Sequence, residues 1–480
     1  MSRAPQKPLV AIIGATGTGK SELAVDIASR FNGEIINGDA MQMYHGLPII
    51  TNKIPEAERK GIPHHLLGCI GLQEETWTVG RFVDKALGVI DEIRARGKLP
   101  ILVGGTHYYT QSLLFKDALA DYSFNSERKE SSDVTAESTG FPILDEPTEV
   151  ILAKLKEVDP VMADRWHPND RRKIQHSLEL YLQTGIPASQ IYDEQRVKRI
   201  SDGIASSDDS VAGLQMRSPT LLLWVHASKE ALHKRLDSRI LKMLDQGLLS
   251  EVDALAAFRS SHEESTGVQI DHTRGIWVSI GYKEFLAYHT ASASGDVPEV
   301  ELEKLKSRAI KATQSATRQY ANRQVRWIRI KLFHALASAG QTSNMFLFDG
   351  TDLSCWEGWV LKPAIQVTQQ FLRGYTLPPP TELSEAAKEM LAPQRDYDMS
   401  LRRDLWVRKT CETCGTVVVT ESDWDRHIKS RGHRRAVAAQ DKESRKAAIK
   451  QDDIKFVQAE LLDVLGKHLD IFNSDEDQQK

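Results

Sequence analysis

Apolar runs alternate with amphipathic segments in the first part of the chain. The β-branched run at 9–13 ends in a glycine-rich turn, and a helical pattern follows over 21–31. Further apolar runs at 34–37, 99–103 and 220–225 predict strands, each separated from its neighbour by helical segments. Because such alternation is typical of parallel sheets covered by helices, we expect an α/β fold with a parallel sheet core.

The pattern changes after the first strands. Polar loops at 121–147 and 201–210 flank two amphipathic helices, and a mainly helical stretch continues to about 348. A proline-rich run at 377–380 predicts the start of a linker. We predict the following segments: a first part of the core at 1–119, a helical insertion at 120–216, a return to the core with basic helices at 217–350, a linker at 351–398, a Cys/His module at 399–440 and a charged tail at 441–480.

Composition narrows the class of protein. The chain has 480 residues, of which 41% are hydrophobic, so it is long enough for several folding units. Its formal net charge is −4, so any surface for a polyanion must be local. The four cysteines are too few for a disulfide framework, and no apolar run is long enough for a membrane span. We expect a cytoplasmic monomer; Arg3 and Lys7, with no acid before Glu22, leave mitochondrial and nuclear pools open.

The turn after the first strand is a candidate phosphate cradle. It fits G-x-x-x-x-G-K-[ST] in the strand, loop and helix setting that this motif requires. Glycines let successive backbone N–H groups converge on phosphate oxygens, while the helix dipole, a lysine and a serine-bound Mg²⁺ add positive charge. A glycine-rich turn with a purely structural role is the alternative. The predicted substrate-binding residues are Gly14, Ala15, Thr16, Gly17, Thr18, Gly19, Lys20 and Ser21.

Residues beyond the cradle argue against a conventional triphosphatase or small-molecule kinase. Triphosphatases and small-molecule kinases place a Mg²⁺-binding aspartate after a second apolar strand, but the run at 101–103 ends in Gly104, Gly105 and Thr106. The nearest acid is Asp39, which follows the second strand and so lies at the same sheet edge as the cradle. A carboxylate there can accept a proton from a weakly nucleophilic amine. Capping a helix and binding Mg²⁺ are the alternatives for Asp39.

Short blocks spread over 8–333 form a combination more specific than any one of them. They are the cradle, Asp39-Ala40-Met41-Gln42-Met43-Tyr44, Pro63-His64-His65-Leu66, Val79-Gly80-Arg81-Phe82, Gly104-Gly105-Thr106, His167-Pro168-Asn169-Asp170, Leu178-Glu179-Leu180-Tyr181 with Thr184-Gly185, and Tyr320-Ala321-Asn322-Arg323-Gln324 before Trp327. In this order they resemble the tRNA dimethylallyltransferase (tRNA isopentenyltransferase) family. The resemblance implies transfer of a dimethylallyl group from dimethylallyl diphosphate to the exocyclic amine of the adenosine 3′-adjacent to the anticodon, which releases pyrophosphate and gives isopentenyladenosine.

The resemblance also implies roles for individual residues. The cradle would hold the donor pyrophosphate with Mg²⁺, Asp39 would be the general base, and Thr106 would lie by the reacting centre. Arg239, in Leu236-Asp237-Ser238-Arg239 before Gly247-Leu248, matches an arginine on the donor pyrophosphate; a solvated helix face is its alternative. The implied contacts with the tRNA anticodon stem-loop are Asp39, Ala40, Met41, Gln42, Arg171, Arg172, Lys173, Ile174, Gln175 and His176, the last of which stands where many relatives have arginine.

A basic stripe is predicted on the helix before residue 330. No acid occurs from 304 to 348, so the stripe is not neutralised within its own segment, and Tyr320 and Trp327 offer stacking planes for unpaired bases. A solvated basic face is the alternative. At 100° per residue the following side chains fall within about one quarter of the helix circumference: Arg308, Lys311, Arg318, Arg326 and Arg329.

Two cysteines and two histidines near the C-terminus have the spacing of a zinc site. Cys411, Cys414, His427 and His433 follow C-x₂-C-x₁₂-H-x₅-H, which suits one tetrahedral Zn²⁺ with a structural role. We expect both histidines on one helix that begins near Ser422, after a short strand. Chance proximity of the four residues is the alternative. The module resembles the C-terminal finger of eukaryotic members of the family.

These observations predict an α/β protein with a P-loop NTPase-like parallel sheet core, a helical insertion and a C-terminal ββα-like zinc finger. Two rival functions stay open. An adenylate isopentenyltransferase shares the cradle and the prenyl donor but uses a free nucleotide, and the finger and the basic stripe argue against it. An RNA-binding adaptor whose cradle merely senses ATP belongs to another class. The acceptor and the fate of the donor distinguish these three readings.

Overall fold

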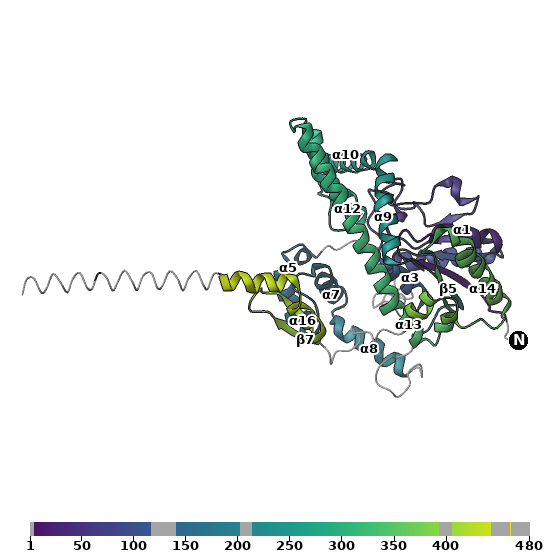
Figure 1. Ribbon diagram of the computed structural model, residues 1–480. Coiled ribbons are helices and arrows are strands. Elements are labelled where there is room, and N and C mark those ends of the chain that lie inside the picture. Colours follow the sequence, from purple (N-terminus) through teal and green to yellow (C-terminus); the bar gives the residue numbers. More distant parts are fainter. Residues whose placement is uncertain (1–3, 117–140, 202–213, 393–405, 443–460, 462–480) are drawn as a thin grey trace, which may run out of the picture. The chain divides into compact units, whose positions relative to one another are not determined.

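The computed structural model describes residues 4–116, 141–201, 214–392, 406–442 and 461 (Figure 1). The chain divides into two compact units. The first comprises Met1–Val134 and Glu194–Asp398, and the second comprises Thr135–Asp193 and Met399–Lys480. Among the described residues, no helix is both long enough and apolar enough to cross a membrane.

A six-stranded parallel sheet is the centre of the first unit. Its strand order is β3-β2-β4-β1-β5-β6. The four strands that the sequence predicts are confirmed, and the parallel core with them. The expected helical stretch up to 348 is wrong at its end, where a sixth strand forms. The bounds are β1 Leu9–Gly14, β2 Gly33–Asn37, β3 His64–His65, β4 Leu99–Val103, β5 Thr220–His226 and β6 Met345–Asp349.

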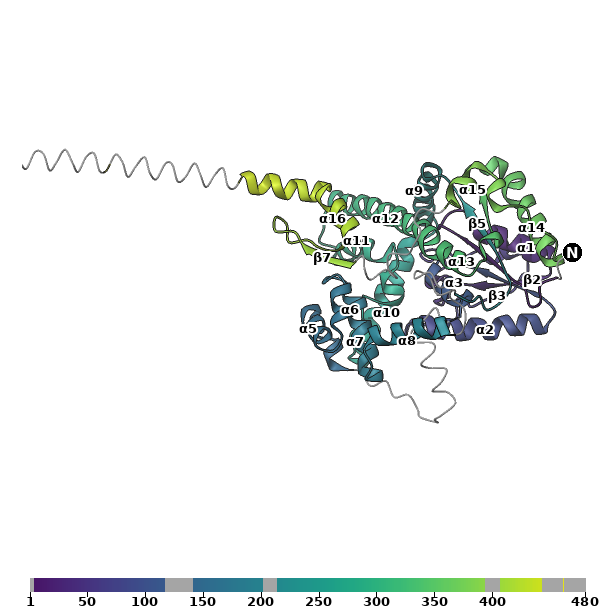
Figure 2. The ribbon, with the colours of Figure 1, turned by 90° about the horizontal axis from the view of Figure 1, so that it is seen from below.

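Helices cover both faces of this sheet. Val10 and Ile12 of β1 pack toward α1 (Lys20–Arg30) and α14 (Lys362–Arg373), which lie side by side in both views (Figures 1 and 2). Ala11 and Ile13 face the opposite side, which is covered by α2 (Val79–Ala95), α3 (His107–Leu114) and α13 (Phe333–Ser338). Alternate residues of each strand are therefore buried on both faces, as the continuous apolar runs predict.

The segment predicted as a linker at 351–398 is instead part of the first unit over its described portion. Val367 and Phe371 of α14 are buried under the sheet, and α15 (Glu385–Met390) packs on β6 with Ala387 buried. Prolines suggested a linker, but the apolar positions between them supply core contacts. Shorter elements of this segment are η7 Leu353–Cys355, η8 Glu357–Leu361 and η9 Pro380–Glu382, and η6 Thr342–Asn344 directly precedes β6.

Three α-helices and one short 3-10 helix follow β5 and lead to the long helix that carries the basic stripe. This helix, α12, spans Glu299–Trp327 and continues as a π-helical turn, η5 (Ile328–Leu332). It packs on α9 and α11. The remaining elements of this region and of the loops after β2 are α9 Lys229–Asp245, α10 Leu248–Thr266, η4 Gly275–Val278, α11 Tyr282–Ser294, η1 Met41–Met43 and η2 Glu56–Arg59.

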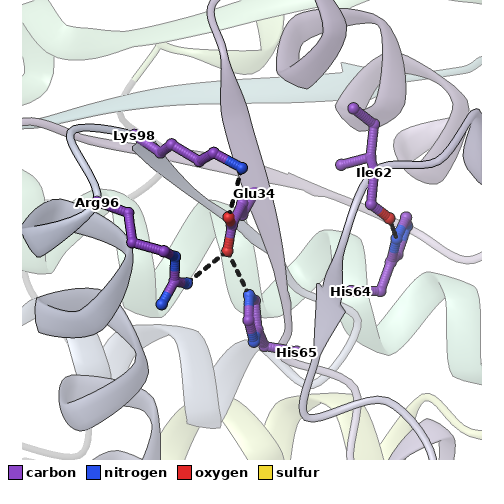
Figure 3. Close-up of polar contacts among 6 residues, drawn as sticks. All are labelled: Glu34, Ile62, His64, His65, Arg96 and Lys98. Atoms are coloured by element: carbon purple, nitrogen blue, oxygen red, sulfur yellow. Dashed lines mark hydrogen bonds and ion pairs between the residues drawn. The ribbon is translucent and has the colours of Figure 1, made fainter.

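A buried carboxylate holds the edge strand β3 to β2. Glu34 is almost fully buried, and its carboxylate accepts bonds from Arg96 at 2.7 Å, Lys98 at 2.8 Å and His65 at 2.6 Å (Figure 3). Although burial opposes ionisation, these three donors lower the pKa of Glu34 to about 2. At the other end of β2, the side-chain amide of Asn37 donates to the carbonyl of Leu66 at 2.9 Å. Both ends of the strand that precedes Asp39 are thus fixed.

The second unit combines helices from the middle of the chain with a hairpin from its C-terminal part. Ile151 and Leu155 of α5 pack on Ile174 and Leu178 of α7. Four described helices occur where the sequence suggested two, because α6 and α8 are short or weakly amphipathic. The bounds are η3 Pro142–Leu144, α5 Thr148–Val158, α6 Pro160–Arg165, α7 Arg171–Thr184, β7 Trp406–Thr410, β8 Val417–Thr420 and α16 Glu421–Ile428. Helix α8, Ala188–Ser201, begins in this unit, and its residues from Glu194 onward belong to the first unit.

Side chains within this unit join the hairpin to α6. The guanidinium of Arg165 lies over the ring of Trp166, with its carbon 4.5 Å from the ring centroid, and over Trp406 of β7 at 4.7 Å. Arg408 of β7 pairs with Asp164 at 3.2 Å. The antiparallel hairpin of β7 and β8 followed by α16 confirms the predicted finger-like arrangement. Residues 121–140 of the loop predicted at 121–147, residues 202–210 of the loop predicted at 201–210, and most of the predicted tail lie outside the described residues.

Candidate active site and nucleic-acid interface

The glycine-rich turn between β1 and α1 adopts a conformation that requires its glycines. Gly17 and Gly19 have φ values of 82° and 93°, and a Cβ on Gly19 would lie 2.4 Å from the indole of Trp356. The hydroxyl of Thr18 donates to the carbonyl of Ala15 at 2.9 Å, which closes the curl. The turn therefore aims its later amides toward one point at the start of α1, where the helix dipole favours an anion.

Two cations meet at this turn. Lys20 Nζ donates to the carbonyl of Ala15 at 2.6 Å, and Arg239 of α9 donates from Nη1 to the hydroxyl of Thr16 at 3.0 Å. Burial lowers the pKa of Lys20 to about 8 and that of Arg239 to about 10, and Arg239 also lowers the pKa of Lys20. Two buried cations with lowered pKa values favour an anionic ligand, because its negative charge would stabilise the protonated form of both side chains.

Asp39 lies in the loop after β2, on the same side of the sheet as the cradle. Its backbone N–H donates to Asn37 Oδ1 at 3.0 Å, and its Oδ1 accepts the N–H of Met41 at 3.1 Å. Burial raises the pKa of Asp39, while the backbone bond from Met41 and the charge of Lys20 oppose that rise. A carboxylate with a raised pKa that faces a pocket is suited to accept a proton.

Gly105 and Thr106 fix the position of Asp39 from the neighbouring strand. A Cβ on Gly105 would lie 2.1 Å from Asp39 Oδ2, so only glycine permits this approach. The hydroxyl of Thr106 accepts the N–H of Ala40 at 3.0 Å, and the N–H of Thr106 donates to the carbonyl of Gly38 at 3.2 Å. Thr106 thus bonds the loop that carries Asp39, and Arg239 bonds the cradle through Thr16. The catalytic roles of Asp39, Thr106 and Arg239 stay a prediction.

A pocket of about 180 Å³ occupies the centre of this site. Its lining includes residues of the cradle together with Asp39 and Gln42. Gly105 and Gln324 also line it. The pocket therefore joins an anion-binding turn to a candidate base, which is the arrangement needed for displacement of a diphosphate by a nucleophile.

Side chains of α12 close the site, although the sequence suggested only an RNA-facing role for them. Gln324 is 4% exposed and bonds both Thr16 and Gly105. The hydroxyl of Tyr320 donates to the carbonyl of Gly105 at 3.4 Å, and burial raises its pKa. The hydroxyl of Tyr320 is therefore directed into the site, and stacking of its ring on an unpaired base stays a prediction. The four-residue spacing of Tyr320 and Gln324 on one helix is the signal that both face the same way.

Two further groups near the cradle had no signal in the sequence. His107, the first residue of α3, is buried beside Lys20, and burial lowers the pKa of its imidazole to about 3, so it is neutral. Lys53 donates to the carbonyl of Gly46 and to the hydroxyl of Thr51, and burial lowers its pKa to about 8. Its charge acts on Asp39 and lowers the pKa of that carboxyl.

The basic stripe on α12 is only partly available to a polyanion. Its exposed members are Arg308, Lys311 and Arg326. Arg318 instead pairs with Asp237 of α9, and Arg329 donates to the carbonyl of Glu389 at 3.5 Å. The prediction concerned only acids within the stripe's own segment, and the acid that pairs with Arg318 comes from another helix.

The second basic block, at the start of α7 in the second unit, has mixed roles. Arg171 donates to the carbonyls of Glu146 at 2.6 Å and Leu144 at 2.9 Å, so it braces the preceding loop. Ile174 is fully buried in the core of this unit, so its side chain is not at the surface. Arg172, Lys173 and His176 are exposed, and Gln175 is half-buried. An RNA contact of this block stays a prediction for the exposed members.

The Cys/His cluster is assembled as the spacing predicts. One ligand atom from each of Cys411, Cys414, His427 and His433 lies within 4.8 Å of the others. Cys414 Sγ is 3.3 Å from His427 Nε2, and Cys411 Sγ is 3.5 Å from His433 Nδ1. His427 lies on α16 but His433 lies on a separate helix at 431–442, so the expectation of one shared helix is wrong. Two thiols and two imidazoles at these separations fit a structural metal ion.

Comparison with known proteins places the chain among characterised relatives. The family model for IPP transferase matches residues 42–331. The tRNA dimethylallyltransferase of Schizosaccharomyces pombe is 37% identical over 443 residues, which cover 90% of this chain and 95% of that protein. The Saccharomyces cerevisiae tRNA dimethylallyltransferase is 35% identical, with 89% of this chain and 91% of that protein covered. A crystal structure of a eukaryotic dimethylallyltransferase acting on tRNA matches with a TM-score of 0.70 at 33% identity, covering 93% of this chain and 100% of that one.

Proposed function

Since this chain belongs to the IPP transferase family of tRNA dimethylallyltransferases, we propose that it transfers the dimethylallyl group of dimethylallyl diphosphate to tRNA. The acceptor is the exocyclic amine of the adenosine 3′-adjacent to the anticodon, and the products are isopentenyladenosine and pyrophosphate. The observation that carries this proposal is the single pocket that Asp39 shares with the cradle. A conventional triphosphatase would also place a Mg²⁺-binding aspartate after a second apolar strand, whereas β4 is followed by Gly104, Gly105 and Thr106.

The reaction is a displacement at the first carbon of the donor. The amine nitrogen forms a bond to that carbon while the bond from the carbon to the diphosphate oxygen breaks, and Asp39 takes the proton that the amine loses. Charge grows on the departing diphosphate, where Lys20, Arg239 and the amides of the turn stabilise it. The allylic group delocalises its own positive charge, so the protein mainly aligns the reactants.

Two metals have separate roles in this proposal. Ser21 lines the pocket beside Lys20, and in this proposal its hydroxyl would hold Mg²⁺ together with the diphosphate. Such an ion supplies positive charge to the leaving group. Zn²⁺ bound by the Cys/His cluster would stabilise the fold of the finger.

The tRNA anticodon stem-loop is the proposed macromolecular substrate. Arg308, Lys311 and Arg326 on α12 supply exposed positive charge for its phosphates. The target adenosine must leave the base stack to reach the pocket, and the loop from Asp39 to Gln42 borders that pocket. Monomeric state and a cytoplasmic location, with mitochondrial or nuclear pools, stay predictions.

Replacing the proposed base tests the reaction. The protein is given dimethylallyl diphosphate, Mg²⁺ and an unmodified anticodon stem-loop, and prenylated adenosine is quantified by nucleoside mass spectrometry. Asp39→Asn should lower turnover by about 10²–10⁴-fold and leave the stem-loop Kd nearly unchanged. The control is Asp91→Asn, which changes an exposed carboxylate of α2. Equal losses of turnover and RNA affinity in Asp39→Asn would remove Asp39 as the base.

The same assay separates the rival functions. An adenylate isopentenyltransferase would prenylate AMP in preference to the stem-loop. An ATP-sensing adaptor would release labelled phosphate from ATP and form no prenylated nucleoside. Preference for the stem-loop with dimethylallyl diphosphate as donor supports the proposal.

A further inference from the structure

One buried amide connects the two loops that hold the reactants. The side chain of Gln324 on α12 accepts the backbone N–H of Thr16 through Oε1 at 2.8 Å. Its Nε2 donates to the backbone carbonyl of Gly105 at 2.7 Å. These partners lie 308 and 219 residues away in the sequence. The bridge therefore joins three separate parts of the chain.

Each end of this bridge is a functional loop. Thr16 belongs to the cradle, and its hydroxyl accepts the bond from Arg239. Gly105 lies against the carboxylate of Asp39 so closely that a Cβ would be 2.1 Å from Oδ2. The side-chain amide of Gln324 therefore links the donor cradle to the loop that lies against Asp39.

The bridge requires one hydrogen-bond acceptor and one hydrogen-bond donor on the same side-chain group, so few residue types can form it. A glutamine side chain supplies both. An ionised glutamate accepts from Thr16 but repels the carbonyl of Gly105, and a methionine of similar shape supplies neither bond. The bridge also occupies the N–H of Thr16, which leaves the later amides of the turn for the diphosphate.

We propose that Gln324 is a positioning residue for prenyl transfer, which sets the distance between the diphosphate in the cradle and the amine at Asp39. This inference deepens the proposed function and rests on it. Misplacement of reactants by about 1 Å can lower a rate by about 10²-fold, so two short bonds to these loops have a large effect. Attachment of α12 does not depend on Gln324, because Gln314 and Arg318 also bind α9.

The test compares two replacements of Gln324 in the full-length protein with zinc bound. Gln324→Met should lower kcat by roughly 10–100-fold, with the stem-loop KM within about threefold of wild type. Gln324→Glu should show a similar loss at high pH. As the pH falls, its kcat relative to wild type should rise, because a protonated carboxyl again donates to Gly105 and accepts from Thr16. Taking the ratio to wild type removes the titration of Asp39.

The control is Gln314→Met, which removes a bond of 3.2 Å to the carbonyl of Asp237 and touches neither loop. It should lower the melting temperature without changing kcat. The inference is overturned if Gln324→Met keeps kcat within threefold of wild type, or if the ratio for Gln324→Glu does not depend on pH. A wild-type protein without prenyl transfer would overturn both this inference and the proposed function, whereas losses confined to the variants concern Gln324 alone.

Discussion

The guanidinium of Arg239 lies 3.0 Å from the hydroxyl of Thr16, so helix α9 brings a cation to the phosphate cradle from 223 residues away in the sequence. Thr16 is therefore held on two sides, by Arg239 through its hydroxyl and by Gln324 through its N–H. The position of the cradle therefore depends on contacts from both α9 and α12.

Loss of the Arg239 charge should slow departure of the diphosphate. We expect Arg239→Gln to reduce kcat by about 10²–10³-fold, since it removes a buried charge from the leaving group. Steady-state kinetics with varied donor measure the effect. Arg235→Gln serves as the control, because Arg235 lies one turn earlier on α9 and donates to the carbonyl of Thr351, away from the pocket. Similar kinetic losses in both variants would argue for a general effect on α9.

The rate should fall in acid because Asp39 must be ionised to accept a proton. Burial raises the pKa of Asp39 above 3.8, so kcat/KM should decline as the pH falls through that raised value, at a higher pH than for an exposed aspartate. The measurement is kcat/KM for dimethylallyl diphosphate, determined across the pH range with saturating stem-loop. Lys53→Met removes a cation that lowers the pKa of Asp39, so it should move this decline to still higher pH. A decline that shifts to lower pH would contradict this assignment.

Glu34 should stabilise the first unit, and this contribution should be lost in acid. Its pKa is lowered to about 2 in the folded protein, so its contribution is present above the ordinary value of 4.5 and disappears as the pH falls toward 2. Glu34→Gln should lower the free energy of unfolding by about 2 kcal/mol at pH 7, since its three cations are partly exposed and can be hydrated. Chemical denaturation measures the change. Asp26→Asn, which breaks the more exposed pair with Lys60, should cost less than about 1 kcal/mol.

Removal of the metal should unfold the finger and spare the donor site. Cys414→Ser should abolish binding of one zinc ion per chain, as measured by atomic emission, and should weaken stem-loop binding. Binding of Mg²⁺ and pyrophosphate should be unchanged, because the cradle belongs to the other unit. Cys69→Ser changes an exposed cysteine outside the cluster and should leave the zinc content intact. Full zinc content in Cys414→Ser would exclude the cluster as the metal site.

The exposed and paired members of the basic stripe should differ in their effect on RNA binding. Replacing Lys311 or Arg326 by alanine should each reduce the slope of log Kd against log salt by about 1, because each removes one phosphate contact. Arg318→Ala should leave that slope nearly unchanged and destabilise the protein, because its charge is paired with Asp237. Equal slopes for all variants would show that α12 does not contact the phosphates.

The sequence predicted those elements whose signal lies within their own residues. Apolar runs identified β1, β2, β4 and β5, and the cradle motif located its own strand and helix. Strand β3 escaped because its two residues, His64 and His65, carry no apolar pattern. The segment containing α14 resembled a linker because its flanking prolines outweighed its buried apolar positions.

Long-range contacts explain what remained hidden in the site. The role of Gln324 depends on Thr16 and Gly105, and the neutralisation of Arg318 depends on Asp237. None of these pairings leaves a spacing that can be read along the chain. By contrast, Asp39, Thr106 and Arg239 were named because a family resemblance already encodes such contacts. Asp39 lines the pocket, Thr106 bonds the loop that carries Asp39, and Arg239 bonds the cradle through Thr16.

The joining of α6 to the hairpin has a consequence for biosynthesis. Asp164 and Arg408 pair across 244 residues, so α6 leaves the ribosome long before its partner strand exists. At roughly 5–20 residues per second this delay is on the order of ten seconds or more, during which Trp166 has no Trp406 to share Arg165 with. Until the hairpin has been translated, the surface of α6 that later contacts it stays exposed on the nascent chain. A chaperone could bind the nascent chain there during this interval.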